Sequence, residues 1–262
     1  MPELPDLEVF SKNLRKKLLN KDIVSAAVFN SPKVNVTSSE FQQKLVSSQI
    51  ESIIRSGKEL SFKLTNNNIF NVHLMLNGKF EVINSQEVKA VKSKIVGIDF
   101  EDGCSLVVHD FQGLCKVTLN PEDSIVPDAL SDEFSFDYFV ESIKKNARKN
   151  IKAFLINQDI VRGIGNAYAD EILFDANISP ESNSGKITEE YLSILYKSIK
   201  DVLMDAILKI EKASPDIISG EERSFLKVHN KNLKHTQDGK EILVKKVASK
   251  TTYMTEEQIL FK

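Results

Sequence analysis

The chain begins Met-Pro-Glu, and its second residue offers a reactive nitrogen. A residue as small as proline permits removal of Met1, which would leave Pro2 with a free secondary amine. An α-amine titrates at about pH 7.7–8.0, so a useful fraction is unprotonated at neutral pH. Such an amine attacks an aldehyde-like sugar carbon and forms an iminium, and Glu3 beside it could move the proton. A retained Met1 would acylate the proline nitrogen, so this hypothesis concerns the processed protein.

Two other segments carry groups that suit an anionic ligand. Lys58 lies in RSGKELSFKL, at a turn into an expected strand. Gly163 and Gly165 would let the backbone approach a phosphate closely, and Asn166 opens the next helix. Amides at a helix start, together with an Asn side chain, bind anionic oxygens well. Taken singly, these residues fit a solvated turn lysine and a glycine-rich helix connection without a ligand better than they fit a binding site.

The overall charge does not identify a partner, but its distribution is uneven. The formal net charge is −2 and the pI about 6.2. Basic residues nevertheless gather in residues 144–152 and in residues 227–250. A local basic face is sufficient to hold a phosphate backbone, although most such runs are simply solvated.

The elements that would position these groups change in type along the chain. Residues 6–19 show apolar residues at helical spacing, and Asp6 after Pro5 is the expected N-cap. From residue 21 to about 120, short alternating runs separated by Asn, Gly and Ser predict many strands, arranged as a sandwich or barrel-like sheet pair. The turn-rich, acidic residues 121–134 are typical of a linker.

Helical patterns follow the linker and give way to a strand-rich tail. The patterns FDYFVESIKKN, ARKNIKAFLIN, NAYADEILFDAN and a long amphipathic stretch predict a helical domain at residues 135–215. The tail, residues 222–262, predicts a strand pair from FLKVHN and KEILVKKVASKTTYM with a turn at residues 237–239. The expected fold class is therefore α+β, with a β domain at residues 1–120, a helical domain and a β-hairpin tail.

Composition favours a cytoplasmic protein. No run approaches the roughly 18 apolar residues of a membrane span. The first residues carry acids and prolines and show no apolar core of a secretory signal. Cys104 and Cys115 fit neither a disulfide framework nor a zinc site.

Taken together, PELPDLEVF, RSGKELSFKL and residues 151–180 resemble the formamidopyrimidine-DNA glycosylase and endonuclease VIII family. The resemblance implies an N-terminal helix and β-sandwich followed by a domain with a helix–two-turns–helix element. It implies that Pro2 is the nucleophile, that Glu3 assists it, and that Lys58 helps the damaged base depart. It also implies that Lys152 and Asn166 grip phosphates of damaged double-stranded DNA.

The tail departs from the family pattern. Many relatives end in a four-cysteine zinc finger, but this tail contains no cysteine. The family register places His235, Asp238, Thr255 and Gln258 at the ligand positions, a set unsuited to structural zinc. The resemblance therefore implies a zincless β-hairpin finger, with no metal. Lys250 stands where the family usually has an arginine that reaches the phosphate beside the lesion, so the resemblance implies that Lys250 binds this phosphate. A lysine keeps the charge of the arginine but loses its bidentate fork.

Two further departures concern the lesion. The resemblance assigns Leu76 (or Met75), Gln112 and Leu114 to the loops that fill the space of an extruded base, although both leucines could instead be core residues. The short stretch of residues 214–225 resembles the endonuclease VIII branch, which favours oxidised pyrimidines and formamidopyrimidines as substrates.

The leading hypothesis is a bifunctional DNA glycosylase and AP lyase of base-excision repair that flips its target base out of the duplex. We expect it to act as a monomer, without a cofactor or nucleotide cofactor and away from membranes, in the cytoplasm or on a bacterial nucleoid. Three alternatives stay open: a lesion- or abasic-site-binding protein with little catalysis, an 8-oxoguanine-preferring glycosylase, and a β-sandwich interaction module without a DNA role.

Overall fold

The computed structural model describes all 262 residues and divides them into two compact units. The N-terminal unit comprises Met1–Asp123 with Ile210–Glu221, and the C-terminal unit comprises Ser124–Lys209 with Glu222–Lys262. Except for residues 210–215, the expected helical domain and the hairpin tail thus belong to one unit. The last residues of the long helix and the segment after it group with the N-terminal unit, where that segment contacts Asn13 and Phe80.

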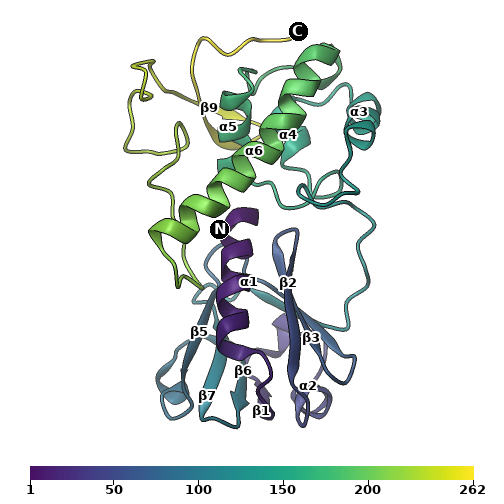
Figure 1. Cartoon of the computed structure of the whole chain (residues 1–262), viewed down its shortest axis with the longest axis vertical. Helices are drawn as coiled ribbons and strands as arrows, with labels where there is room; N and C mark the ends of the chain where they lie inside the picture. Colours follow the sequence, from purple (N-terminus) through teal and green to yellow (C-terminus); the bar gives the residue numbers. More distant parts are fainter. The chain divides into compact units, whose positions relative to one another are not determined.

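Helix α1 (Leu4–Leu18) lies along the sandwich beside strand β2 (Figure 1). It begins earlier than the sequence predicts, so the assignment of Asp6 as N-cap is wrong. Glu3 is the N-cap, Pro5 occupies the first turn, where its missing N–H is no loss, and Asp6 completes a capping box. The predicted apolar face, which includes Leu7 and Phe10, is buried as expected.

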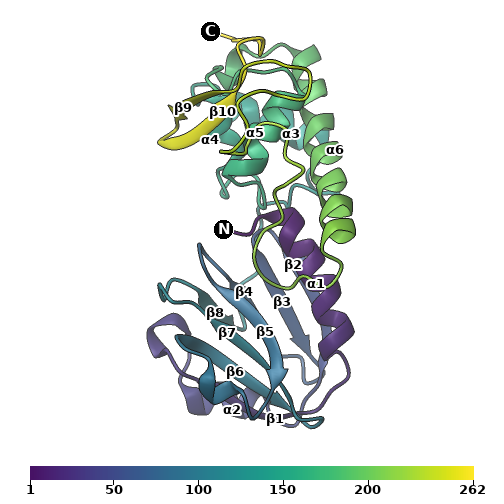
Figure 2. The same ribbon diagram turned by 90° about the vertical axis from the view of Figure 1, so that its left-hand side faces the viewer.

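The N-terminal unit is a sandwich of two four-stranded antiparallel sheets, which confirms the predicted β domain (Figure 2). One sheet has the order β2-β3-β4-β8 and the other the order β1-β6-β7-β5. The strands are β1 (Ile23–Val28), β2 (Ile50–Ser56), β3 (Glu59–Leu64), β4 (Ile69–His73), β5 (Lys79–Asn84), β6 (Lys94–Phe100), β7 (Cys104–His109) and β8 (Lys116–Leu119).

Aromatic packing forms the centre of this sandwich. Phe62 and Phe70, cross-strand partners on β3 and β4, stack with ring centroids 4.6 Å apart, and both are fully buried. Three short elements that the sequence did not predict complete the unit. They are η1 (Ser31–Lys33), α2 (Ser38–Leu45) and η2 (Val88–Ala90).

The C-terminal unit contains the predicted helices around an aromatic core that includes Phe139 and Phe154. The expected helix over ARKNIKAFLIN is shorter, because the Asn150 side chain caps its start by accepting two backbone N–H groups. No helix here is long and apolar enough to cross a membrane. The helices are α3 (Phe136–Lys145), α4 (Ile151–Leu155), α5 (Asn166–Asp175), η3 (Ser184–Lys186) and α6 (Glu189–Ala213).

The tail forms a hairpin, but its strands differ from the predicted ones. Strands β9 (Leu243–Val247) and β10 (Lys250–Met254) pair with each other, and β10 lies beside α5 (Figure 2). Ala248 and Ser249 both adopt positive φ, the geometry of the two-residue turns that favour hairpins. The assignment of FLKVHN as a strand is wrong, because Glu171 accepts the backbone N–H groups of residues 227–229.

The stacked pair gives a test of the sandwich core. We expect Phe62→Ala to lower the free energy of unfolding by about 3–5 kcal/mol, because it opens a cavity beside Phe70. The matched change Ile54→Ala, on a side chain that is 54% exposed, should stay within about 0.5 kcal/mol. Urea unfolding followed by circular dichroism measures both, and equal effects would contradict this packing.

Candidate active site and DNA-binding surface

The first residues are held at the buried start of α1. Pro2 and Glu3 are both buried, and the Asp6 carboxylate accepts the backbone N–H of Glu3 at 2.9 Å. The terminal ammonium of Met1 forms an ion pair with Glu221. Glu221 is thus an acidic group next to the chain terminus, and no motif in the sequence singled it out.

Lys58 occupies the predicted turn, between β2 and β3. Gly57 precedes it with φ 62°, a conformation that glycine adopts without strain. Lys58 is half-buried, and its charge lies close enough to His73 on β4 to help lower the pKa of that imidazole. Pro2, Glu3 and Lys58 therefore all belong to the N-terminal unit.

The residues predicted to fill the space of an extruded base lie on two loops, which we call the wedge loops: residues 74–78 and residues 110–115. The loops are joined where Asn77 Nδ2 donates to Gln112 Oε1 at 2.6 Å. Leu76 is 53% exposed and Leu114 is half-buried, so neither is a fully buried core residue. Phe111, which no sequence motif indicated, lies on the second of these loops and is 73% exposed.

A buried carboxylate fixes the second wedge loop. Asp110 accepts the backbone N–H groups of Gln112, Leu114 and Cys115 at 2.6–2.9 Å. These hydrogen bonds favour the charged form, and the pKa of Asp110 is lowered although burial opposes the shift. The loop therefore keeps one shape and holds Gln112 and Leu114 at defined positions.

A neutral histidine fixes the first wedge loop. His73 Nδ1 accepts the backbone N–H of Met75 at 3.0 Å, and Met75 has φ 55°. Burial lowers the pKa of His73, and the positive charges of Lys58 and Lys116 act in the same direction, whereas Glu59 raises it. The imidazole thus stays unprotonated at neutral pH and can accept this bond.

In the C-terminal unit, the predicted phosphate-binding turn has the expected shape. The Gln158 side chain accepts the N–H of Gly163 at 3.0 Å and donates to the carbonyl groups of Ile156 and Ile164. Gly163 adopts φ 104°, and α5 begins at Asn166. Asn166 Nδ2 donates to the Thr251 carbonyl at 2.9 Å, so Asn166 and the start of β10 are neighbours.

Lys152 differs from the expectation. Its side chain is completely buried, and Nζ forms an ion pair with Asp170 at 2.7 Å and donates to Thr252 Oγ1 at 2.6 Å. A side chain without exposed surface does not reach a DNA phosphate, so its assignment as a phosphate ligand is corrected. Lys152 instead ties α4 to α5 and to β10.

Asp170 connects the helices to the hairpin. Besides Lys152, it accepts the backbone N–H of Tyr253 at 3.0 Å and contacts His229 Nδ1 at 2.7 Å. The hairpin presents Lys250 as an exposed residue directly after its turn. The sequence displays the basic residue, but only the structure shows that the buried Asp170 carboxylate holds β10, the strand that carries Lys250.

The four residues at the family's zinc-ligand positions make internal hydrogen bonds. Gln258 accepts the N–H of Thr255 and donates to the Ile178 carbonyl, both at 2.8 Å, while Asp238 accepts from Thr236. His235 pairs through its backbone with Glu241. No three His, Cys, Asp or Glu side chains in the structure are grouped so that they could hold a metal ion.

Comparisons with known proteins agree with this arrangement. Residues 1–117 match the model of the formamidopyrimidine-DNA glycosylase N-terminal domain, and residues 125–216 match that of its H2TH domain. The formamidopyrimidine-DNA glycosylase of Carboxydothermus hydrogenoformans is 32% identical over 239 residues, covering 88% of this chain and 89% of that protein. That of Enterococcus faecalis is 34% identical, covering 79% and 76%.

Solved structures give the same result. A complex of wild-type Lactococcus lactis Fpg (MutM) with DNA containing an oxidised pyrimidine matches with a TM-score of 0.86 and 27% identity, over 97% of this chain and 98% of that one. A C248GH mutant of LlFpg bound to THF-containing DNA matches with a TM-score of 0.87 and 26% identity, over the same shares.

The β-sandwich, the helix–two-turns–helix element and the basic hairpin define a DNA glycosylase of base-excision repair. More narrowly, the chain belongs to the formamidopyrimidine-DNA glycosylase family.

The buried ion pair gives a first prediction at this site. We expect Lys152→Met and Asp170→Leu each to lower the free energy of unfolding by about 3–5 kcal/mol, because each leaves one buried charge without its partner. The double variant should lose clearly less than the sum, and additive losses would contradict direct coupling.

The salt dependence of DNA binding distinguishes the exposed lysine from the buried one. In DNA-binding titrations at several salt concentrations, Lys250→Met should reduce the magnitude of the slope of log K against log [salt] by about 1, and Lys152→Met should leave it unchanged.

The histidine beneath the first wedge loop predicts a pH dependence. Because the pKa of His73 is lower folded than unfolded, its contribution to stability is complete above about pH 6.5. Below that pH the unfolded chain takes up the proton first, so stability falls as the pH drops toward the folded pKa. Urea unfolding between pH 7 and pH 5 should show a smaller loss for His73→Gln than for the wild type. The exposed control His235→Gln should follow the wild type, and an unchanged loss in His73→Gln would refute the assignment.

Proposed function

We propose that the processed chain excises oxidised bases from double-stranded DNA and then cleaves the strand through a Schiff base on Pro2. The observation that supports this most directly is the placement of Pro2 and Glu3 at the capped, buried start of α1 in a chain of this family. A terminal nucleophile needs a fixed position, and the capping box supplies it.

In the proposed mechanism, the Pro2 nitrogen bonds to C1′ of the extruded nucleotide, and the glycosidic bond to the damaged base breaks. Lys58 assists the departing base, which leaves with the bonding electrons and gains a proton. Glu3 protonates the ring oxygen, so the C1′–O4′ bond opens and an iminium forms. The iminium acidifies the C2′ protons, and loss of one of them expels the 3′ phosphate by β-elimination. A second elimination expels the 5′ phosphate.

Binding is proposed to rest on backbone contacts and on the wedge loops. Asn166 and the exposed Lys250 contact phosphates, and Lys58 contacts the phosphate beside the lesion, which positions DNA without reading its sequence. Leu76 and Leu114 occupy the space of the extruded base, and Gln112 hydrogen-bonds the base left behind. The wedge loops support this role, because both hold their side chains at defined positions. Lys152 contributes to DNA binding only indirectly, because it helps to hold the hairpin that carries Lys250.

The preferred lesions are proposed to be oxidised pyrimidines and formamidopyrimidines. Residues 214–225 are short, as in the endonuclease VIII branch, and the structure of the L. lactis relative contains an oxidised pyrimidine. A similar protein has also been solved with carbocyclic 8-oxo-G, which keeps 8-oxoguanine as the alternative substrate. Excision rates on all three lesions, in duplex and single-stranded DNA, decide between them. We also propose that the protein acts as a monomer on the chromosome.

Borohydride trapping on DNA with an abasic site tests the nucleophile. We expect the processed wild type to form a covalent adduct, because reduction fixes the iminium. Pro2→Leu should form almost none, since its bulky second residue retains Met1 and displaces the amine. Lys58→Ala provides the matched control: it should lose excision of an intact damaged base but keep the adduct on abasic DNA.

A wild type that binds abasic DNA tightly but forms no adduct would overturn the proposal. That outcome would favour the second reading, a lesion-binding protein with little catalysis.

A further inference from the structure

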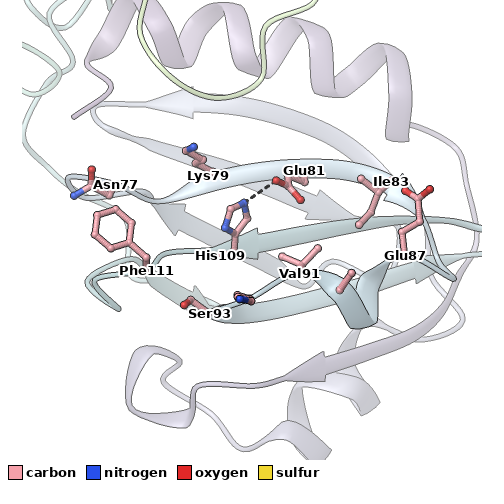
Figure 3. Close-up of a pocket in the computed structure, with 11 residues that line it drawn as sticks. Asn77, Lys79, Glu81, Ile83, Glu87, Val91, Ser93, His109 and Phe111 are labelled. Atoms are coloured by element: carbon pink, nitrogen blue, oxygen red, sulfur yellow. Dashed lines mark ion pairs between the residues drawn. The ribbon is translucent and has the colours of Figure 1, made fainter.

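A groove of about 570 Å³ crosses the outer face of the sheet β1-β6-β7-β5 (Figure 3). This volume lies within the range of about 300–1,000 Å³ that small-ligand sites occupy. Side chains of β5 form one wall, and residues 87–93, which include η2, form the other. The Lys94 ammonium holds that second wall by donating to the Val88 carbonyl at 2.9 Å. The groove lies wholly within the N-terminal unit, and the mechanism above does not use it.

Two titratable side chains meet in the middle of the groove. His109 Nε2 on β7 lies 3.1 Å from Glu81 Oε1 on β5, as the dashed line in Figure 3 marks. That contact lacks hydrogen-bond geometry, and the buried Nε2 has no other hydrogen-bond partner. Because this nitrogen has no exposed surface, a ligand in the groove reaches the pair through the Glu81 carboxylate, whose side chain is 40% exposed.

An aromatic ring stands at one end of the groove. Figure 3 shows Phe111 and Asn77 together at this end, which is also where Asn77 bonds Gln112 of the neighbouring wedge loop. Phe111 is 73% exposed, so one face of its ring is available to a ligand. Exposed aromatic rings are the usual platform on which unpaired bases stack. The groove thus opens where the wedge loops meet.

The charges of the groove exclude a highly anionic ligand. Lys79 and Lys92 are balanced by Glu81 and Glu87. The carboxylate of Glu81 in the middle of the groove repels phosphate but accepts hydrogen bonds from amino groups. Lys79, nearer the Phe111 end in Figure 3, suits one anionic group at the entrance. The matching ligand is planar, carries an amino group on its inner edge and has one phosphate outside.

We propose that this groove binds one unpaired nucleotide, with its base against Phe111, its amino edge at the Glu81 carboxylate, and its phosphate at Lys79. In DNA the nucleotide comes from the undamaged strand next to the wedge loops, so this inference rests on the proposed function. Adenine, cytosine and guanine carry an exocyclic amine with two N–H donors, whereas unpaired thymine offers only its N3–H. The groove therefore favours a base with an amine over thymine.

The test uses the full-length protein and two duplexes with a stable abasic analogue. Each duplex has one extra unpaired nucleotide in the undamaged strand, beside the position opposite the analogue: cytosine in one and thymine in the other. We expect the wild type to bind the cytosine duplex about tenfold more tightly, a difference on the scale of one hydrogen bond to a charged group. In the isosteric Glu81→Gln the ratio of the two Kd values should fall below about two. Phe111→Leu should weaken binding of both duplexes about equally, because stacking does not distinguish the two bases.

Glu51→Gln is the matched control, because Glu51 is also a strand glutamate in an exposed ion pair, with Lys63 at 2.9 Å, but lies on the other sheet. Its ratio should equal that of the wild type. Free dCMP and dTMP separate the two possible sources of the nucleotide. If dCMP shifts the His109 imidazole signals in proton NMR while the duplexes are not distinguished, the groove binds a free mononucleotide and not a DNA base. That outcome supports nucleotide recognition in the groove and refutes its origin in the undamaged strand.

Wild-type protein that neither distinguishes the duplexes nor responds to dCMP would overturn the inference. A cytosine preference that Glu81→Gln retains would overturn it too, as would unchanged Kd values in Phe111→Leu. Borohydride trapping of the wild type on a fully paired abasic duplex is measured in the same series. An adduct there without any nucleotide selectivity refutes only the groove, whereas a missing adduct refutes the proposed function itself.

Discussion

A residue at the end of a chain has a covalent neighbour on one side only, so it is ordered only where other contacts hold it. The proposed chemistry places its nucleophile, Pro2, at such a position. The N-terminal unit meets this constraint with α1, whose apolar face is completely buried against the sandwich. Glu3 and Asp6 fix the first turn through the capping box, so the ordering of the terminus depends on the stability of the sandwich. A change deep in the sheets can therefore affect the proposed nucleophile without touching it.

Buried carboxylates organise the other functional segments in a similar way. Asp110 gathers three backbone N–H groups of one wedge loop, and Glu171 gathers three from residues 227–229. Asp170 joins two helices and the hairpin through Lys152, His229 and Tyr253. Each buried charge costs free energy that only a full set of donors offsets. The loops that they hold consequently have little freedom to adopt another shape.

Local pattern predicted most elements of this fold, because period-two and helical spacing directly reflect burial on one face. The strand-rich sandwich and the start of α5 at Asn166 agree with the prediction from the sequence. The prediction of a strand at FLKVHN was wrong, because the alternating pattern does not show that the distant Glu171 carboxylate binds the backbone of this segment. Lys152 was misassigned for a related reason: a sequence displays a charge but not its burial. Phe111, Glu221 and the His109–Glu81 contact depend on tertiary neighbours that no local pattern reveals.

The two cysteines have a consequence for a DNA glycosylase of base-excision repair. Burial, assisted by the charge of Asp110, raises the pKa of Cys115 to about 12, and burial also raises the pKa of Cys104. Peroxides attack the thiolate rather than the thiol, so both sulfur atoms react slowly at neutral pH. The conditions that generate damaged bases thus leave the thiols of the repair protein largely intact.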